Sequence, residues 1–253
     1  MIKFKDVSKA FGKKVVLDHL SLEIPPGKIS FILGKSGEGK SVTIKHIMGL
    51  LKPDSGEIIV DDEKISEKSE KNLRAYRKKF GMLFQHAALF DSLTVGENVI
   101  FPLKEEAYFN STLALPEMLE RVEHVLTQVG LPNMQHKFPT ELSTGEKKRV
   151  GLARALVTKP RFMLYDEPTT GMDPMISEMI DELIVQMNKD EKEMTSIVIS
   201  HDLKAALATA ENIIFLYKGK LSLSGTPDDF RNSKDPIVRQ FFSGKVDGPM
   251  EFL

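Results

Sequence analysis

The chain lacks cysteine and tryptophan, and it has almost no net charge. Because none of its 253 residues is cysteine, disulfides, thiolate catalysis and cysteine-ligated metal sites are excluded. Lysine and arginine together number 35 against 36 aspartates and glutamates, which gives no general electrostatic basis for binding DNA or RNA. We therefore expect no nucleic-acid partner.

Long hydrophobic runs are also missing. No apolar run approaches the roughly 20 residues that a membrane-spanning helix needs. The first residues, Met-Ile-Lys-Phe-Lys, do not resemble the hydrophobic segment of a signal peptide. We expect a soluble, cytoplasmic chain that meets a membrane only through a partner, with a length that suits one large domain or a core with an inserted subdomain.

What the chain does contain is a phosphate-binding loop at residues 34–41. The sequence Gly-Lys-Ser-Gly-Glu-Gly-Lys-Ser matches the pattern G-x-x-x-x-G-K-[ST]. An apolar run predicts a buried strand over 29–33, and helical spacing predicts a helix over 41–51. Glycines let backbone N–H groups turn toward one anion, and the helix N-terminus adds partial positive charge. Lys40 is suited to the β- and γ-phosphates and the Ser41 hydroxyl to Mg²⁺.

Polar side chains end three further strands that we expect to be buried. Residues 81–85 end at Gln85, residues 161–167 end at Asp166 and Glu167, and residues 196–200 lead to His201. Ligands of an open parallel sheet lie beyond the carboxyl ends of its strands. We therefore expect these side chains to converge with the phosphate-binding loop on one nucleotide.

Each of these side chains has a matching chemistry. Asp166 and Gln85 suit Mg²⁺ opposite Ser41, Glu167 suits polarising the attacking water, and His201 suits donation to the γ-phosphate. The structural alternatives are a solvated acidic pair, a strand-edge glutamine and a histidine satisfied by its neighbours.

Two later segments have the composition of helix N-termini. In Leu-Ser-Thr-Gly-Glu at 142–146, Ser143 and Glu146 predict a capping box. Asp173, followed by proline, predicts the start of another helix. A chain that already has a phosphate-binding loop thus carries a second helix end suited to an anion, which suggests that two chains share nucleotides head to tail.

The remaining pattern gives the organisation of the chain. Alternating residues predict antiparallel strands over 1–24 and a hairpin over 212–224, and the charged stretch 61–71 is expected to be an exposed loop. We predict an α/β core from residues 1–85 and 160–230, a helical subdomain over 86–159 and a C-terminal tail over 231–253.

With these motifs, the chain resembles the nucleotide-binding subunits of ABC transporters over nearly its whole length. The resemblance carries a Walker A loop, a Q-loop glutamine, a signature, a Walker B pair, a D-loop and a switch histidine, in that order along the chain. It implies a P-loop NTPase core with a RecA-like mixed sheet, an N-terminal antiparallel β layer and an inserted helical subdomain. It also implies an ATPase that uses ATP and Mg²⁺ as a homodimer on an integral-membrane permease.

The resemblance assigns roles to individual residues. ATP contacts are implied for Phe11, by stacking on adenine, and for Val16, Gly34, Lys35, Ser36, Gly37, Glu38, Gly39, Lys40, Ser41 and Val42. Contacts across the dimer are implied for Ser143, Thr144, Gly145 and Glu146, with Asp173 in the D-loop. Glu167 and His201 are the implied catalytic residues, and Ser41, Gln85 and Asp166 the implied metal ligands.

The signature departs from the usual Leu-Ser-Gly-Gly-Gln. Thr144 replaces a glycine and Glu146 replaces the glutamine. A β-branched residue restricts the backbone, and a carboxylate adds negative charge. Because a capping box turns Glu146 away from a phosphate, we expect the site to remain active.

A narrower resemblance is to the ATPases of Mla-type phospholipid transporters. It depends on residues 45–56, residues 88–99 and the tail at 235–249. It implies a peripheral place on the cytoplasmic face of the inner membrane, an MCE-domain partner and a small STAS-type regulator. It also implies a tail that reaches the partner ATPase through apolar residues, namely Ile237, Phe241, Phe242, Phe252 and Leu253.

Three alternatives remain open. They are an ABC ATPase for another cargo, a soluble ABC ATPase of the translation or DNA-repair type, and a non-catalytic binding module.

Overall fold

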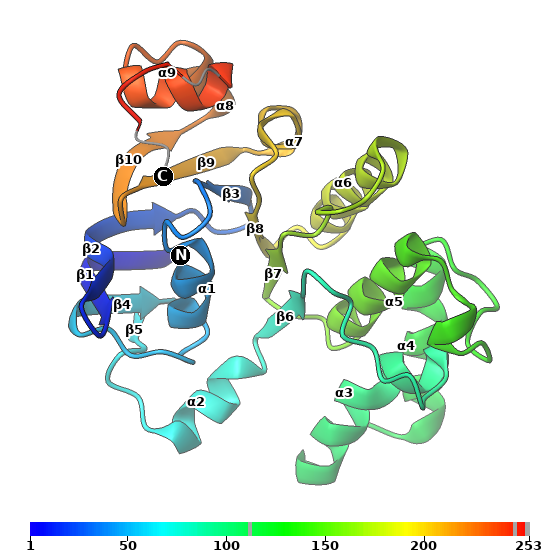
Figure 1. The fold of residues 1–253 in the computed structure, drawn as a ribbon. Coiled ribbons are helices and arrows are strands. Elements are labelled where there is room, and N and C mark those ends of the chain that lie inside the picture. Colours follow the sequence, from blue (N-terminus) through cyan, green and yellow to red (C-terminus); the bar gives the residue numbers. More distant parts are fainter. Residues whose placement is uncertain (111–112, 245–246, 251–253) are drawn as a thin grey trace. The chain divides into compact units, whose positions relative to one another are not determined.

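The computed structural model describes residues 1–110, 113–244 and 247–250. They form two compact units (Figure 1). The first unit comprises Met1–Arg77 and the chain from Ile197 onward, and the second comprises Lys78–Ser196. The predicted boundaries of the core, the helical subdomain and the tail stay a prediction.

An antiparallel sheet forms the N-terminal part of the first unit. Its order is β2-β1-β4-β5, with β1 at Ile2–Phe11, β2 at Lys14–Ile24, β4 at Ser55–Val60 and β5 at Glu63–Lys64. Strands β1 and β2 pair from Ile2 opposite Ile24 to Phe11 opposite Lys14. The predicted antiparallel layer is therefore confirmed.

The expectation of an exposed loop over 61–71 was wrong. That stretch contains β5 and the start of helix α2 (Glu70–Arg77), and Ile65 is buried. Charged residues of the stretch pair at the surface, with the Lys68 ammonium 2.6 Å from Glu63 and the Lys64 ammonium 2.6 Å from Glu57 of β4. Surface pairing of the charges leaves the single apolar side chain free to enter the core.

A second sheet in the first unit positions the phosphate-binding loop. The fully buried strand β3 (Ile29–Leu33) pairs in parallel with β9 (Asn212–Tyr217), which pairs antiparallel with β10 (Lys220–Gly225). The predicted 212–224 hairpin is thus confirmed. Besides α2, the helices of the first unit are α1 (Lys40–Ile47), α7 (Leu203–Thr209), α8 (Pro227–Arg231) and α9 (Pro236–Ser243).

Helix α1 ends earlier than the predicted position 51. Gly49 follows it with a φ of 64°, in the left-handed region that ends helices. A Cβ at Gly49 would lie 2.6 Å from Leu73 Cδ2, so helix α2 packs where a side chain would otherwise stand.

The second unit combines two parallel strands with helices. Strand β6 (Phe80–Leu83) pairs with β7 (Phe162–Asp166), with Phe80 opposite Phe162 and Leu83 opposite Tyr165. The helices are α3 (Val95–Asn110), α4 (Leu115–Gln128), the short η1 (Pro139–Glu141), α5 (Thr144–Leu156) and α6 (Pro174–Asp190). Helices α3, α4 and α5 pack against one another. Strand β8 (Thr195–Ile199), fully buried, begins in this unit and ends in the first.

The C-terminal segment packs on its own unit. The Phe241 ring lies 4.6 Å from the Phe215 ring, and the Phe242 ring lies 5.1 Å from the Phe230 ring, centroid to centroid. The buried Gln240 side chain accepts a 2.6 Å hydrogen bond from the Met250 N–H. Phe252 and Leu253 lie outside the described residues.

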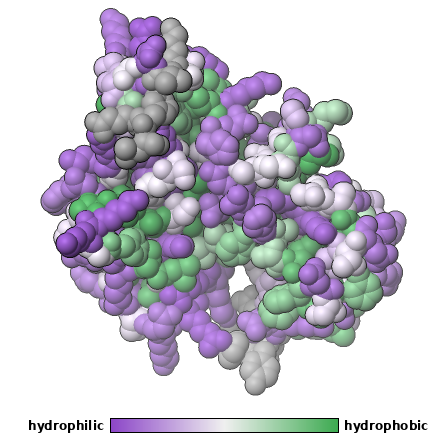
Figure 2. Space-filling model, viewed as in Figure 1, coloured by the Kyte–Doolittle hydropathy of each residue, from purple (hydrophilic) through white to green (hydrophobic). Residues whose placement is uncertain are grey.

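Hydrophilic residues cover most of the face shown in Figure 2, with hydrophobic residues in scattered groups. Among the residues described, no helix combines the length and hydropathy needed to cross a bilayer.

Candidate functional site

The phosphate-binding loop needs its glycines for space. A Cβ at Gly34 would lie 2.7 Å from the Leu216 carbonyl oxygen, and one at Gly39 would lie 2.6 Å from Leu17 Cδ2. Gly37 and Gly39 also take positive φ angles of 85° and 93°, which side-chain-bearing residues rarely adopt. Gly34 and Gly39 therefore let the loop pack directly against β9 and β2 in a backbone conformation that residues with a side chain rarely adopt.

Lys40 lies along this loop. It is buried, and its Nζ donates to the carbonyl oxygens of Gly34 at 2.7 Å and Lys35 at 3.0 Å. Helix α1 begins at Lys40, with Gly39 as an N-cap that offers no side chain. Because the first N–H groups of a helix have no intrahelical partner, this end is suited to an anion.

The N-terminal hairpin and the β9–β10 turn border the loop. Val16 lies beside Gly39, whose added Cβ would be 3.0 Å from the Val16 carbonyl oxygen. The Lys218 N–H donates to the Glu38 carboxylate. Phe11 is 48% exposed, and Lys9 Nζ lies 5.7 Å from the centroid of its ring. The structure therefore leaves an aromatic surface accessible on the hairpin that reaches the loop.

His201 lies at the same end of the sheet as the loop. The Ser200 N–H bonds to the Ile32 carbonyl at 3.4 Å, so His201 and Gly34 follow neighbouring positions of adjacent strands. Asp202 caps helix α7 through the Ala205 N–H. The imidazole side chain itself is exposed.

Gln85, Asp166 and Glu167 stand at the carboxyl ends of two paired strands of the second unit, β6 and β7. Leu83 and Tyr165 are paired, so the three polar residues follow the same register position of parallel strands. Glu167 has a φ of 49°, an uncommon left-handed conformation that costs roughly 1–3 kcal/mol and is concentrated at functional sites. Thr170 Oγ1 donates to Glu167 Oε2 at 2.7 Å, which fixes the direction of the carboxylate.

The predicted capping box at the signature is confirmed. The Ser143 N–H and hydroxyl donate to Glu146 Oε2 at 2.8 and 2.7 Å, and the Glu146 N–H donates back to Ser143 Oγ at 3.3 Å. The Ser143 hydroxyl and backbone N–H hold the pKa of Glu146 below its usual value. The carboxylate that replaces the usual glutamine is therefore engaged in its own helix cap.

The predicted cap at Asp173 is also confirmed, since its Oδ1 accepts from the N–H groups of Met175 and Ile176 at 3.1 Å. Helices α5 and α6 begin close together, because a Cβ at Gly145 would lie 3.0 Å from Ile176 Cγ2.

The predicted metal ligands are oxygen donors, a type that suits a hard cation. Among the described residues there is no group of three or more histidines and carboxylates able to hold a metal ion. Mg²⁺ usually takes one or two carboxylates and fills its remaining positions with water and phosphate oxygens. The hydroxyl, amide and carboxylate oxygens of Ser41, Gln85 and Asp166 are of the type that Mg²⁺ prefers.

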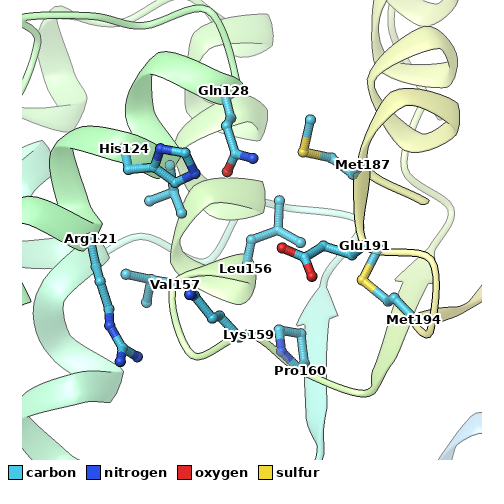
Figure 3. Close-up of a pocket in the computed structure, with 11 residues that line it drawn as sticks. Arg121, His124, Gln128, Leu156, Val157, Lys159, Pro160, Met187, Glu191 and Met194 are labelled. Atoms are coloured by element: carbon cyan, nitrogen blue, oxygen red, sulfur yellow. The ribbon is translucent and has the colours of Figure 1, made fainter. Parts of the chain in front are cut away.

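A separate pocket in the second unit is shown in Figure 3. It has a volume of about 70 Å³, and His124, Lys159 and Glu191 are among the residues that line it. Pro160 in its wall precedes β7, whereas Asp166 and Glu167 stand at the opposite end of that strand. None of the predicted site residues lines this pocket, so it is distinct from the candidate nucleotide site.

Comparisons with known proteins agree with the resemblance to ABC transporter subunits. The profile of the ABC transporter family matches residues 17–170. The intermembrane phospholipid transport system ATP-binding protein MlaF of Haemophilus influenzae is 37% identical over 252 residues, which cover 100% of this chain and 94% of that protein. The probable ribonucleotide transport ATP-binding protein mkl of Mycobacterium leprae is 38% identical over 249 residues, which cover 98% of this chain and 70% of that protein.

A solved dimeric ATP-binding cassette in a post-hydrolysis state, bound to ADP and Pi, has a similar structure. It superimposes with a TM-score of 0.79 at 31% identity, over 90% of this chain and 99% of that one.

Proposed function

Because the chain belongs to the ABC transporter family as an ATP-hydrolysing, nucleotide-binding subunit, we propose that it powers a permease that moves phospholipid between the inner and outer membranes. It acts as a homodimer, and ATP binding and hydrolysis close and reopen the pair. Opening and closing of this kind is a two-state change biased by ligand contacts.

The agreement in length with the phospholipid-transport relative supports this cargo most. The alignment covers 100% of this chain and 94% of MlaF, including the C-terminal segment. A chloroplastic Arabidopsis thaliana relative named TRIGALACTOSYLDIACYLGLYCEROL 3 also carries a lipid name, at 37% identity over 271 residues. Another cargo is the second candidate, because a similarly identical relative is named for ribonucleotide transport.

The candidate residues have separate roles in binding the nucleotide and its metal ion. The loop at 34–42 and Lys40 hold the phosphates, Phe11 stacks on adenine and Val16 borders the nucleotide. Ser41, Gln85 and Asp166 would hold Mg²⁺, which neutralises charge on the phosphates when bound.

Glu167 orients and deprotonates the attacking water, for which its fixed carboxylate is suited. His201 donates to the γ-phosphate. From the other protomer, the segment from Ser143 to Glu146 closes the site with its helix N-terminus, and Asp173 stands in the D-loop beside it.

The partners follow from the same proposal. The permease anchors the ATPase to the cytoplasmic face of the inner membrane, with an MCE-domain protein and a small STAS-type regulator in the assembly. The tail at 244–253 contacts the partner ATPase. Its removal should weaken dimerisation, measured by analytical ultracentrifugation with ATP, and an unchanged dimer constant would exclude this contact.

The test of function is reconstitution with the permease that copurifies with the full chain. Proteoliposomes containing labelled phospholipid, or labelled ribonucleotide in a parallel sample, are supplied with ATP. We expect ATP-dependent transfer of phospholipid to acceptor membranes, abolished by Glu167→Gln in the same complex. Ribonucleotide movement without phospholipid transfer would refute the cargo, whereas absence of ATP hydrolysis by the assembled complex would refute the enzymatic function.

A further inference from the structure

Two side chains of helix α5 donate hydrogen bonds to backbone carbonyls on both sides of Gln85. Lys148, only 3% exposed, donates from Nζ to the Phe84 carbonyl at 3.1 Å. Arg154 donates from Nη2 to the Ala87 carbonyl and from Nη1 to the Ala88 carbonyl, both at 2.8 Å. Two cations of one helix thus hold the residue before Gln85 and the second and third residues after it.

A close approach between these two sets of hydrogen bonds completes the contact. Gly151 stands three residues after Lys148 and three before Arg154, so the three positions share one helix face. A Cβ there would lie 3.1 Å from Leu83 Cδ1 and 3.3 Å from both the Cβ and the carbonyl oxygen of Ala87. Glycine therefore lets the segment after β6 lie directly on the helix, and Figure 1 shows this segment running past α5.

The segment at residues 84–88 includes an uncommon backbone conformation. Ala88 has a φ of 50°, which is uncommon for a residue with a side chain. Such conformations persist where the surroundings fix them. Arg154 binds the carbonyl of this residue with one arm of a planar fork, while the other arm binds its neighbour, so the guanidinium is suited to fixing both peptide planes.

We propose that Lys148 and Arg154 are positioning residues that fix residues 84–88 to helix α5. Gln85 and the Ser143 end of α5 then move as one body. The inference deepens the role proposed above for Gln85. Helix α5 begins at the capping box of Ser143 and reaches Arg154 within the same rigid element. A displacement of Gln85 by its ligand would then also shift the N-terminal end of α5, which is proposed above to close the site of the other protomer.

The test compares two arginines of one helix. Arg149 also binds two backbone carbonyls, those of Val129 at 3.3 Å and Gly130 at 3.1 Å, but these belong to the end of α4. In the full chain, Arg154→Lys, Arg154→Met and Lys148→Met are compared with Arg149→Lys and Arg149→Met. Nucleotide affinity, kcat, KM and the Mg²⁺ concentration for half-maximal turnover are measured for each.

We expect Arg154→Met to lower kcat by about 10- to 100-fold and to raise the Mg²⁺ requirement, because small misplacements of a positioned group are costly. Arg154→Lys keeps the charge but has one donor nitrogen where arginine uses two, so its kcat should lie between that of Arg154→Met and that of the parent. ATP affinity stays within about twofold, and combining Arg154→Met with Gln85→Ala adds little to either change alone. A parent-like kcat in Arg154→Met, or equal kinetic losses in the Arg149 variants, would overturn the proposal.

Hydrogen exchange of the peptide covering residues 84–90 decides the matter without turnover. In the conservative Arg154→Lys variant these amides should exchange faster than in the parent, while Arg149→Lys leaves them unchanged. Unchanged exchange in Arg154→Lys would overturn the attachment of residues 84–88 to α5 itself. Parent-like turnover of Gln85→Ala would instead overturn the role proposed for Gln85, which keeps the two failures apart.

Discussion

The buried Lys148 should carry a measurable cost in folding stability. Burial lowers the pKa of this ammonium from 10.5 to about 8, although the charge of Asp166 opposes part of the shift. At neutral pH the folded chain must therefore hold a proton on a group from which burial favours its release. Lys148→Met removes this charge and keeps a side chain of similar length.

The size and sign of the effect follow from proton linkage. Between the folded and unfolded pKa values the unfolded chain binds the additional proton, so the free energy of unfolding rises with pH in that window. With pKa values of about 8 and 10.5, the contribution of Lys148 becomes more favourable by about 2 kcal/mol from pH 7 to 9.5. Lys148→Met lacks this contribution.

The assay is urea unfolding of both proteins at pH 7, 8, 9 and 9.5, followed by circular dichroism. Groups common to both proteins cancel when the two free energies of unfolding are subtracted. We expect the parent to gain about 2 kcal/mol relative to Lys148→Met over this range. A difference that stays constant within about 0.5 kcal/mol would refute the desolvation of Lys148. If the gain appears while Lys148→Met loses turnover, the buried charge is retained for function at the expense of stability.

Three further predictions concern the site and its first helix. Glu167→Gln should keep ATP affinity and lower single-turnover hydrolysis by about 10²- to 10⁴-fold, and a loss of only a few-fold would remove Glu167 from the role of base. Glu146→Ala should lower the free energy of unfolding by about 0.5–1 kcal/mol at pH 7, a difference that vanishes as acid protonates the carboxylate, while Glu146→Gln preserves the capping box. Burial lowers the pKa of His46 below 6.5, so its contribution to stability is complete above pH 6.5 and is lost as the pH falls through the folded pKa; His46→Gln should flatten the acid side of the stability profile, and parallel profiles would contradict this.

Local signals explain why the two helix caps and the strand before the phosphate-binding loop could be predicted. A capping box needs only four consecutive residues, and both Ser143–Glu146 and the Asp173 cap formed as the pattern indicated. The strand before the phosphate-binding loop was also visible, because a run buried on both faces is apolar throughout. The charged composition of residues 61–71 predicted an exposed loop, which was wrong. Ile65 is one apolar residue among charges that pair at the surface, and it is buried.

The contacts that the sequence did not reveal join residues far apart in the chain. Lys148 and Phe84 are 64 positions apart, and Arg154 and Ala87 are 67. Their bonds end on backbone carbonyls, which every residue has, so no residue type at 84, 87 or 88 announces them. A glycine inside a helix costs about 1 kcal/mol relative to alanine, which is a hint that position 151 has a packing role but does not identify the neighbour. The capping box orients the signature through adjacent residues, whereas the placement of Gln85 depends on the folded second unit, so the signature is encoded locally and its connection to Gln85 is encoded by packing.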